Sequence, residues 1–499
     1  MGQRCRFPRI RYFLLAGLCL FCTFIPERKY QKYNNHAYAG QEKRMKKSIL
    51  TGAVTVISML VSSQLMAQGY YVDEQSALRL GDAFSGGSAS ASDASTAFYG
   101  PAAMTLLNDE IVFNIAAVDF SSSFDGDATT LGGAPINGKD AEADSLDMLP
   151  SVYMVRELSD GFKMGVYMNA PYATGTDFGK DSVTRYQASE SEITGIDAGF
   201  ALAMRLNDKV SIGGSFIAQY VNAKTAVAVN TLALCLGAEA SGELPAGTCT
   251  AVGVDSSELG NTTYDGYFEM EGHNMAYGFA LGTLIEFTPQ SRLGINYRSR
   301  IAHTLSGNAE VTFPASAAGF TGLAGLADTK ADGKVSLTTP ETASLSYFHR
   351  FGSVAVQADY SWTRWSRYDE VKVRSRNAVV ATLAEAPQVY DWTESQRIAI
   401  GASWQVMPAL TLRAGMAVDK TPIEDENAKV DFAFDDYQAV SLGMSYALNE
   451  ELTLDVGLQH TFEQTRDIDQ NDLTTSASAL EGEVTTQVNS YAAGLRWAL

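Results

Sequence analysis

The chain has 499 residues, of which 46% are hydrophobic and 19% are charged, and its formal net charge is -20. This hydrophobic content is enough to bury a core, which excludes a disordered polymer. The acidic balance excludes a nucleic-acid partner, because such a partner needs a basic face. After residue 67 no uninterrupted apolar run approaches the roughly 18 residues of a membrane-spanning helix. A large soluble β-protein or a membrane β-barrel remains.

The first 67 residues predict targeting rather than a folded domain. Residues 1–44 are basic, and we interpret them as an over-extended gene start, with a genuine N-terminal extension as the alternative. From Met45 onward, two lysines, an apolar stretch and a small-residue exit predict a secretory signal peptide over 45–67, cleaved after Ala67. Removing 1–67 takes away 11 Lys/Arg and 2 Asp/Glu, so the mature net charge becomes -20 - 9 = -29.

Residues 68–108 are small and polar, with a Gly-rich run from Gly81 to Gly87. A segment of this composition cannot form its own core, so we expect it to lie inside a barrel as a plug, or hatch. A periplasmic tail is the alternative. The run also resembles a phosphate-binding loop, but it lacks the terminal Lys-Ser/Thr and the flanking strand and helix that such a loop needs.

From residue 109 to the C-terminus, apolar and small or polar residues alternate with a period of two. In the last strand, Tyr491, Leu495 and Trp497 share one face, whereas Gly494 and Arg496 fall on the other. This pattern suits a strand between lipid and a polar lumen. A soluble sandwich alternates as well, so the pattern alone does not decide the fold.

The spacing of the turns decides it. Short polar turns, whose Gly, Pro, Asn, Asp and Ser supply the required torsions, alternate with longer Gly/Ala/Ser/Asp-rich loops. The turns lie at 157–161, 206–209, 288–291, 349–353, 406–409 and 448–451, and the loops at 122–144, 171–189, 230–262, 303–334, 374–388, 420–435 and 465–481. Seven loops and six turns predict an all-β transmembrane antiparallel β-barrel of 14 strands over 109–499, with both termini on the short-turn side. Such a barrel is hollow, because only about eight strands let side chains fill the interior.

Several blocks resemble, in order, the FadL family of outer-membrane transporters of hydrophobic compounds. Ser76–Gly87 is similar to the opening of the family's hatch, and Asp93–Met104 resembles the stretch that ends in the family's Asn-Pro-Ala motif. This chain has Gly100, Pro101 and Ala102 there, so a side chain that could tether the hatch is missing. Further resembling blocks cover 172–178, 293–299, 360–366, 397–403 and 410–415.

The resemblance implies passive uptake of a hydrophobic molecule, with long-chain fatty acid as the expected substrate. In the family the molecule is caught in an apolar groove between extracellular loops and released laterally past the hatch. The resemblance also implies an outer-membrane location, a monomer, insertion by the barrel-assembly machinery, and contact with outer-membrane lipid and lipopolysaccharide. The alternatives are a monoaromatic hydrocarbon uptake channel and a structural or adhesive barrel that acts as a phage or host receptor.

Apolar side chains on water-facing loops are candidates for the groove, because exposed apolar patches are costly unless they serve binding. They are Leu232, Leu234, Leu236, Phe313, Phe320, Leu323 and Leu326, and packing of the loops on each other is the alternative. A fatty-acid carboxylate would need a lumenal cation, for which Lys224 and Lys372 are candidates. Pro171 cannot donate to a ladder, so it marks either a strand interruption that opens the wall or the end of a strand.

The mature chain keeps two cysteines, Cys235 and Cys249, in a stretch that predicts a loop. In the oxidising compartment of a secreted protein this pair is expected to form a disulfide, with two free thiols as the alternative. Neither cysteine has a histidine at metal-ligand spacing, so we expect no metal site. The mature histidines fit no catalytic triad, and we therefore expect neither enzymatic activity nor a cofactor.

Overall fold

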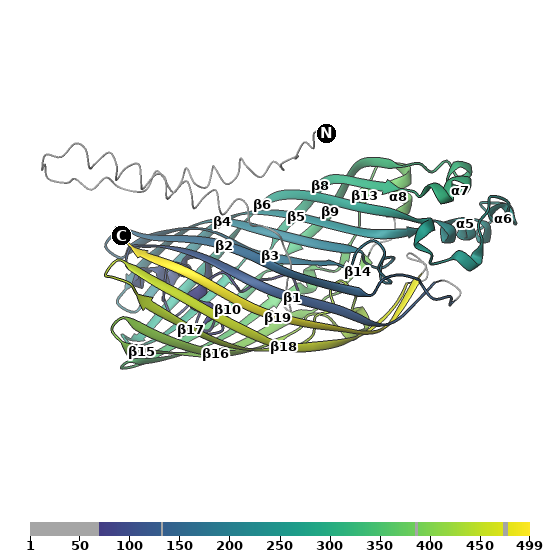
Figure 1. The fold of residues 1–499 in the computed structure, drawn as a ribbon. Helices are drawn as coiled ribbons and strands as arrows, with labels where there is room; N and C mark the ends of the chain where they lie inside the picture. Colours follow the sequence, from purple (N-terminus) through teal and green to yellow (C-terminus); the bar gives the residue numbers. More distant parts are fainter. Residues whose placement is uncertain (1–68, 131–132, 385–387, 473–477) are drawn as a thin grey trace, which may run out of the picture.

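The computed structural model describes residues 69–130, 133–384, 388–472 and 478–499. The predicted signal peptide and the upstream extension lie outside the described residues. The described chain forms a closed antiparallel barrel of tilted strands, because β1 pairs with both β2 and β19 (Figure 1). The strands are β1 Glu110–Thr130, β2 Ala141–Ser159, β3 Phe162–Asp177, β4 Glu190–Asn207, β5 Val210–Asn230, β6 Asp265–Thr288, β7 Ser291–Arg298, β8 Ile301–Thr312, β9 Thr329–Thr339, β10 Thr342–Phe351, β11 Val354–Arg364, β12 Glu370–Val371, β13 Arg374–Ser375, β14 Gln388–Val389, β15 Glu394–Met407, β16 Leu410–Lys420, β17 Tyr437–Ala447, β18 Leu452–Asp472 and β19 Ser478–Ala498.

The 17 strands of the main sheet make 14 crossings of the barrel wall. β7 and β8 are two pieces of one crossing, interrupted at Ser299 and Arg300, and β9 and β10 are two pieces of the next, interrupted at Pro340 and Glu341. The short β13 belongs to a loop and pairs with β9. The predicted strand number is therefore confirmed.

The two faces of each strand differ as a membrane barrel requires. On β4, Phe200, Leu202 and Met204 are exposed, whereas Ala201 and Ala203 between them are buried. The exposed face of the wall is thus the apolar one, which suits contact with lipid hydrocarbon. None of the helices in the described residues is long and apolar enough to cross a membrane.

All six predicted short turns join consecutive crossings, and they lie at the end of the barrel that carries the C-terminus (Figure 1). Several loops are shorter than predicted. β1 continues to Thr130, β3 to Asp177 and β18 to Asp472, and β8 and β9 occupy much of the predicted loop 303–334. Small and polar residues were interpreted as loop, but pairing satisfies the backbone of such residues equally well. The loop between β11 and β15 is longer than predicted, at 365–393.

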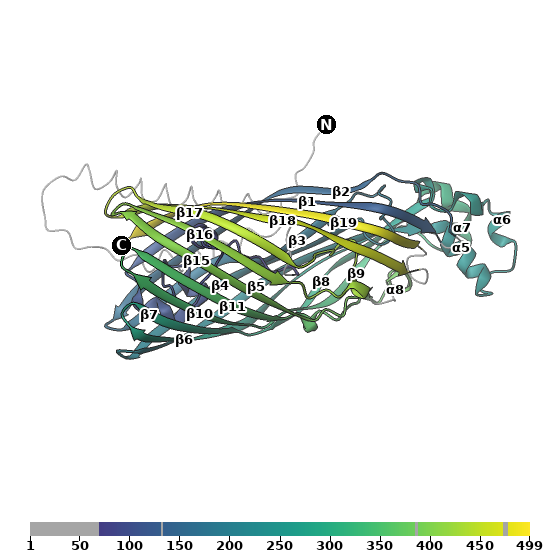
Figure 2. The same cartoon turned by 90° about the horizontal axis from the view of Figure 1, so that it is seen from below.

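Short helices lie in the loops and in the N-terminal segment. Those of the N-terminal segment are α3 Ala77–Leu80, α4 Thr96–Tyr99 and the 3-10 helix η1 Pro101–Leu106, and those of the loops are α5 Thr231–Ala240, α6 Thr248–Ala251, α7 Ala318–Leu323 and α8 Ala378–Leu383, with the 3-10 turns η2 Ser256–Glu258, η3 Thr262–Tyr264, η4 Ala315–Ala317, η5 Trp365–Arg367 and η6 Asp425–Asn427. In two perpendicular views, α5, α6 and α7 lie together at the end opposite the C-terminus (Figures 1 and 2). The N-terminal segment lies inside the barrel, as predicted for a hatch.

Candidate functional site

The hatch consists of two parts, which we call the N-terminal arm (Gly69–Gln75) and the hatch body (Ser76–Leu106). Arg79 organises the body: its side chain is fully buried, donates to Gly87 O and Thr96 Oγ1, and lies 4.8 Å from the ring centre of Tyr99. The body is joined to the wall by hydrogen bonds, among them one from Gln357 to Asp82. The hatch is therefore hydrogen-bonded to the inner face of the barrel wall.

Wall glycines let the body approach the strands at backbone distance. A Cβ on Gly415 of β16 would lie 2.3 Å from the carbonyl carbon of Asp82, and one on Gly443 of β17 would lie 2.6 Å from Gly81 Cα. A Cβ on Gly213 of β5 would lie 2.5 Å from Ala102 N. These positions accept no other residue without movement of the hatch. The body is thus seated against several strands around the barrel.

Close packing explains why the Gly100-Pro101-Ala102 stretch has a glycine where the family's Asn-Pro-Ala motif has an asparagine. A Cβ on Gly100 would lie 2.5 Å from Ser88 Cα, so the place of the missing side chain is filled by hatch backbone. Pro101 begins η1, and the fixed φ of proline suits the first position of a helix. Ala102 packs against the wall glycine of β5.

The wall is not fully paired between β2 and β3. Pairing runs from Ser159 and Phe162 at the turn to Val152 and Met168, and there the ladder between these strands ends. Beyond that point β2 continues beside β1, and β3 continues beside β4. This unpaired stretch, 141–151 facing 169–177, is called the gap below.

Prolines stand on both sides of the gap. Pro171 lies in a bulge of β3 between Asn169 and Tyr172, and β3 continues past it to Asp177. Pro150 lies in β2, two residues beyond the last pair. A proline has no N–H to give to a ladder, so the two edges are poorly suited to pair with each other. Pro150 was not singled out from the sequence.

The N-terminal arm covers the free edge of β3. Val72 N–H donates to Pro171 O at 2.9 Å, and Ala173 N–H donates to Tyr70 O at 3.1 Å. The side-chain amide of Gln75 donates to Ala170 O and accepts from Ala170 N–H, at 2.8 and 3.0 Å, as a peptide group would. The arm therefore stands where β2 would otherwise pair.

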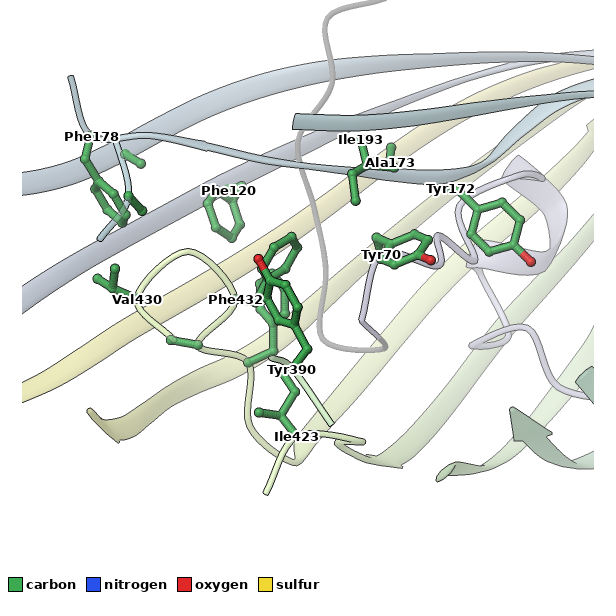
Figure 3. Close-up of a cluster of buried hydrophobic side chains, with 14 of the residues drawn as sticks. Tyr70, Phe120, Tyr172, Ala173, Phe178, Ile193, Tyr390, Ile423, Val430 and Phe432 are labelled. Carbon is green, nitrogen blue, oxygen red and sulfur yellow. The ribbon is translucent and has the colours of Figure 1, made fainter. Parts of the chain in front are cut away.

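Above the hatch, the lumen is filled by apolar and aromatic side chains. They come from the strands, from the arm and from the loops 365–393 and 421–436, whose members include Trp392, Tyr390 and Phe432. In Figure 3 the side chains of Tyr70, Tyr390 and Phe432 extend from different segments toward one interior region.

A polar cavity lies between the hatch and the wall. Two guanidinium groups line it, those of Arg298 on β7 and Arg397 on β15. Arg298 pairs with Asp197 at 2.6 Å, and Arg397 pairs with Asp73 of the arm at 3.0 Å. The sequence contained the signal for Arg397, because it alternates with the outward-facing Ile398 and Ile400. Sequence reasoning nevertheless missed both arginines.

The two lysines named from the sequence lie elsewhere. Lys224 shares the outward face of β5 with Phe216, and its ammonium lies 2.7 Å from Glu190 and 3.5 Å from Glu269. It therefore points away from the lumen, because the face of a strand residue is set by its parity. Lys372 lies half-buried between β12 and β13, in the loop that joins β11 to β15, rather than on a crossing strand.

The predicted groove residues are divided between three environments. Leu232 and Phe320 are buried together where α5 meets α7, with Leu234, Leu236 and Leu326 partly buried against them. Phe313, with Leu234, packs against the lumenal cluster, whereas Leu323 is exposed. Cys235 and Cys249 are bonded to each other within the loop cluster. The structure thus brings the loops together at the mouth of the barrel, and much of this apolar surface is used in loop packing.

Two carboxyl groups of the hatch are unusual. Burial raises the pKa of Glu74 to about 7, and the neighbouring Asp73 carboxylate adds to the rise. Burial also raises the pKa of Asp82 to about 7, against the opposing effect of Arg79. Among the described residues, no group of three or more His, Cys, Asp and Glu side chains is arranged to hold a metal ion.

Comparison with known proteins places this architecture in a family. The model of the family described as "Outer membrane protein transport protein (OMPP1/FadL/TodX)" matches residues 58–498. The chain belongs to this family. It is therefore an outer-membrane β-barrel of a transport family, and the resemblance drawn from the sequence is confirmed.

Relatives of known sequence or structure support the assignment. The long-chain fatty acid transport protein of Escherichia coli K12 is 26% identical over 434 residues, which cover 82% of this chain and 91% of that protein. A Pseudomonas aeruginosa FadL homologue has a TM-score of 0.76 at 22% identity, covering 86% of this chain and 99% of that one. The Ralstonia pickettii toluene transporter TbuX has a TM-score of 0.60 at 16% identity, covering 87% and 99%. The two solved structures show the shared fold.

Proposed function

We propose that this protein takes up hydrophobic small molecules, with long-chain fatty acid as the foremost substrate, and releases them sideways through the gap between β2 and β3. The observation that carries the proposal is the N-terminal arm, which covers an unpaired strand edge directly beneath an apolar lumen. The family assignment supports transport, and the fatty acid transport protein of Escherichia coli supports the substrate.

The route begins at the loops. Apolar side chains of α5 and α7 gather at the mouth of the barrel, where an amphipathic molecule would leave water. It would pass through the aromatic lumenal cluster toward the hatch. The hatch body is seated on wall glycines, so a path straight through the barrel requires that many close contacts break at once. Release of the short arm exposes the gap at far smaller cost.

The polar cavity gives a carboxylate a place to bind. The guanidinium groups of Arg298 and Arg397 line it together, and Arg298 Nε is buried without a hydrogen-bond partner among the described residues. A fatty-acid carboxylate would accept charge-assisted hydrogen bonds from these groups. Arg397 also holds Asp73 of the arm, so a carboxylate that competes for Arg397 would loosen the arm.

The experiment is uptake of labelled oleate by cells that lack the gene and carry the wild type or Arg397→Gln. We expect wild-type protein to restore uptake, and Arg397→Gln to raise the oleate concentration needed for half-maximal uptake by roughly tenfold, the cost of one charge-assisted hydrogen bond. Arg413→Gln is the control, because Arg413 donates to Ser445 and does not line the cavity. Restored uptake that is independent of Arg397 would contradict the proposed carboxylate site. A lack of uptake by the wild type would contradict the proposed transport function.

Monoaromatic hydrocarbons are the second candidate substrate. The aromatic lining of the lumen favours them, since ring edges and faces pack well against planar molecules. Toluene uptake measured in the same strains separates the two, because toluene has no carboxylate for the arginines of the cavity to bind.

A further inference from the structure

One side chain of the arm occupies a site of its own. The ring of Tyr70 is fully buried and is surrounded by four aromatic rings, which we call the aromatic box. Its members are Tyr172, Trp365, Tyr368 and Trp392, with ring centres 5.8, 4.7, 5.4 and 6.2 Å from that of Tyr70. The rings meet Tyr70 edge-on or tilted, which is the favourable geometry for aromatic pairs.

The box is built by segments that are far apart in the sequence. Trp365 and Tyr368 follow β11, Trp392 precedes β15 and Tyr172 lies on β3. The arm backbone also touches the box, because a Cβ on Gly69 would lie 2.7 Å from Trp392 and 2.9 Å from Trp365. Tyr70 therefore occupies an aromatic site that other segments of the chain build, in the way that a ligand would.

The polar atoms of the box are only partly satisfied by Tyr70. Its hydroxyl donates to Thr338 O at 3.2 Å. The indole N–H groups of Trp365 and Trp392 are buried, at 0% and 1% exposure, and make no hydrogen bond in the described part of the chain. Buried donors without partners are costly, so these two groups favour an occupant that brings an oxygen acceptor.

We propose that the aromatic box is a binding site for monocyclic phenols, which compete with Tyr70 for it. A phenol supplies the ring that the box encloses, a hydroxyl that can donate to Thr338 O, and an oxygen that can accept from a buried indole. The site is distinct from the carboxylate cavity, which is lined by Tyr71 rather than Tyr70. The inference rests on the proposed function only in requiring that small hydrophobic molecules reach the lumen.

Occupation of the box would act on the gap. Tyr70 O accepts from Ala173 N–H at the free edge of β3, so an arm that leaves the box also loses this bond. A phenol that displaces Tyr70 would thereby uncover the gap beside it. Recognition and release would be coupled through a single residue.

The test compares p-cresol with toluene, which differ by one hydroxyl group, in calorimetric titrations of the purified barrel in detergent. Toluene is the more hydrophobic of the two, so simple partition predicts that it binds at least as well. We expect wild-type protein to bind p-cresol at least tenfold more tightly than toluene, and equal or weaker binding of p-cresol would overturn the proposal.

Variants locate the site. Trp365→Phe and Trp392→Phe keep a ring but remove the N–H, and each should weaken p-cresol binding by roughly threefold to tenfold with less effect on toluene. Trp404→Phe is the control, because Trp404 is 52% exposed on β15. Tyr70→Ala should vacate the box and raise the affinity for p-cresol at least tenfold. An unchanged p-cresol affinity in all three box variants, despite folded barrels, contradicts the assignment.

These outcomes are separable from those of the proposed function. Protein-dependent uptake of oleate with no preference for p-cresol would overturn the phenol site and leave the transport proposal intact. Preferential p-cresol binding without protein-dependent uptake of oleate or toluene would support the site and contradict the transport proposal.

Discussion

The two parts of the hatch are held in different ways. The hatch body is in backbone contact with wall glycines on several strands, and two consecutive non-glycine residues, Ala83 and Phe84, adopt positive φ of 54° and 56°. Such torsions persist only where the surroundings impose them. The N-terminal arm is held instead by separate polar contacts and by the contacts of Tyr70 with its box. These polar contacts include two backbone bonds and the Gln75 amide to β3, hydroxyl bonds from Ser151 and Tyr153 of β2 to Gln75 O, one from Ser490 to Glu74, and the Arg397–Asp73 pair. The body is thus held by close packing, whereas the arm is held largely by individual polar contacts.

We infer from this difference that the arm, rather than the hatch body, is the part that moves. Moving the body would separate many close van der Waals contacts at once, whereas moving the arm breaks hydrogen bonds that water can replace. The gate should therefore be confined to the arm, and the hatch body should remain in the barrel during transport. Four experiments test this expectation.

The largest effect is expected from locking the arm to β3. Tyr71 and Tyr172 are directly opposed in an isolated antiparallel bridge, so Tyr71→Cys with Tyr172→Cys should form a disulfide. Oleate uptake should fall more than tenfold on oxidation and recover on reduction. Ala417→Cys with Ala439→Cys, opposed on the fully paired β16 and β17, is the matched control. Full uptake by the locked arm would show that the arm is not the gate.

The next largest effect is expected where the hatch body packs against the wall glycines. Gly415→Ala would place a methyl group 2.3 Å from the carbonyl carbon of Asp82, and we expect it to destabilise the seated hatch by about 1–3 kcal/mol. Thermal unfolding followed by circular dichroism measures it. Gly237→Ala is the control, because nothing lies within 4 Å of the added methyl group. If Gly415→Ala is as stable as the wild type, the body is not held by close approach.

A smaller effect should follow from loosening the arm at Gln75. Gln75→Leu keeps the volume but removes both hydrogen bonds to Ala170, so thiol labelling of a reporter Val72→Cys should accelerate roughly threefold to tenfold. Gln187→Leu removes comparable bonds to Ser478, in which the arm takes no part, and should leave the labelling rate unchanged. Equal labelling in both variants would mean that Gln75 does not hold the arm.

The smallest effect is a dependence on pH. The pKa of Glu74 and that of Asp82 are both raised to about 7, so the folded hatch binds protons that the unfolded chain has released. The seated hatch should therefore be most stable below the ordinary carboxyl pKa and lose stability as pH rises toward 7. Proteolysis of the hatch should be faster at pH 8 than at pH 5, and Glu74→Gln should reduce this difference. A flat pH profile would contradict the assignment.

Much of the architecture was readable in the sequence. Alternation in segments such as 491–499 defined the lipid face, and the order of short turns and long loops gave the strand number. Both are local properties, since period-2 faces and turn torsions depend on neighbouring residues. The small, polar composition of 68–108 likewise indicated a segment that cannot form its own core and must pack inside another structure. Loop boundaries were less accurate, because Gly, Ala, Ser and Asp do not distinguish a loop from a strand that extends beyond the membrane.

The site depended on tertiary structure. Lys224 was named as a lumenal cation, but its parity with Phe216 on β5 turns it outward, whereas Arg298 and Arg397 reach the cavity from β7 and β15. Pro171 was visible in the sequence, yet the gap also needs Pro150 on the neighbouring strand and an arm that covers the edge.

The sequence by itself determined the kind of molecule: a chain whose alternating strands and turn spacing make a fourteen-stranded barrel around an N-terminal hatch. Only the tertiary structure decided which residues meet inside it. The reason is that the aromatic box, the glycine seats and the covering of the gap by the arm each join residues separated by about one hundred to several hundred positions, and such contacts are fixed by strand register and barrel closure rather than by any local pattern.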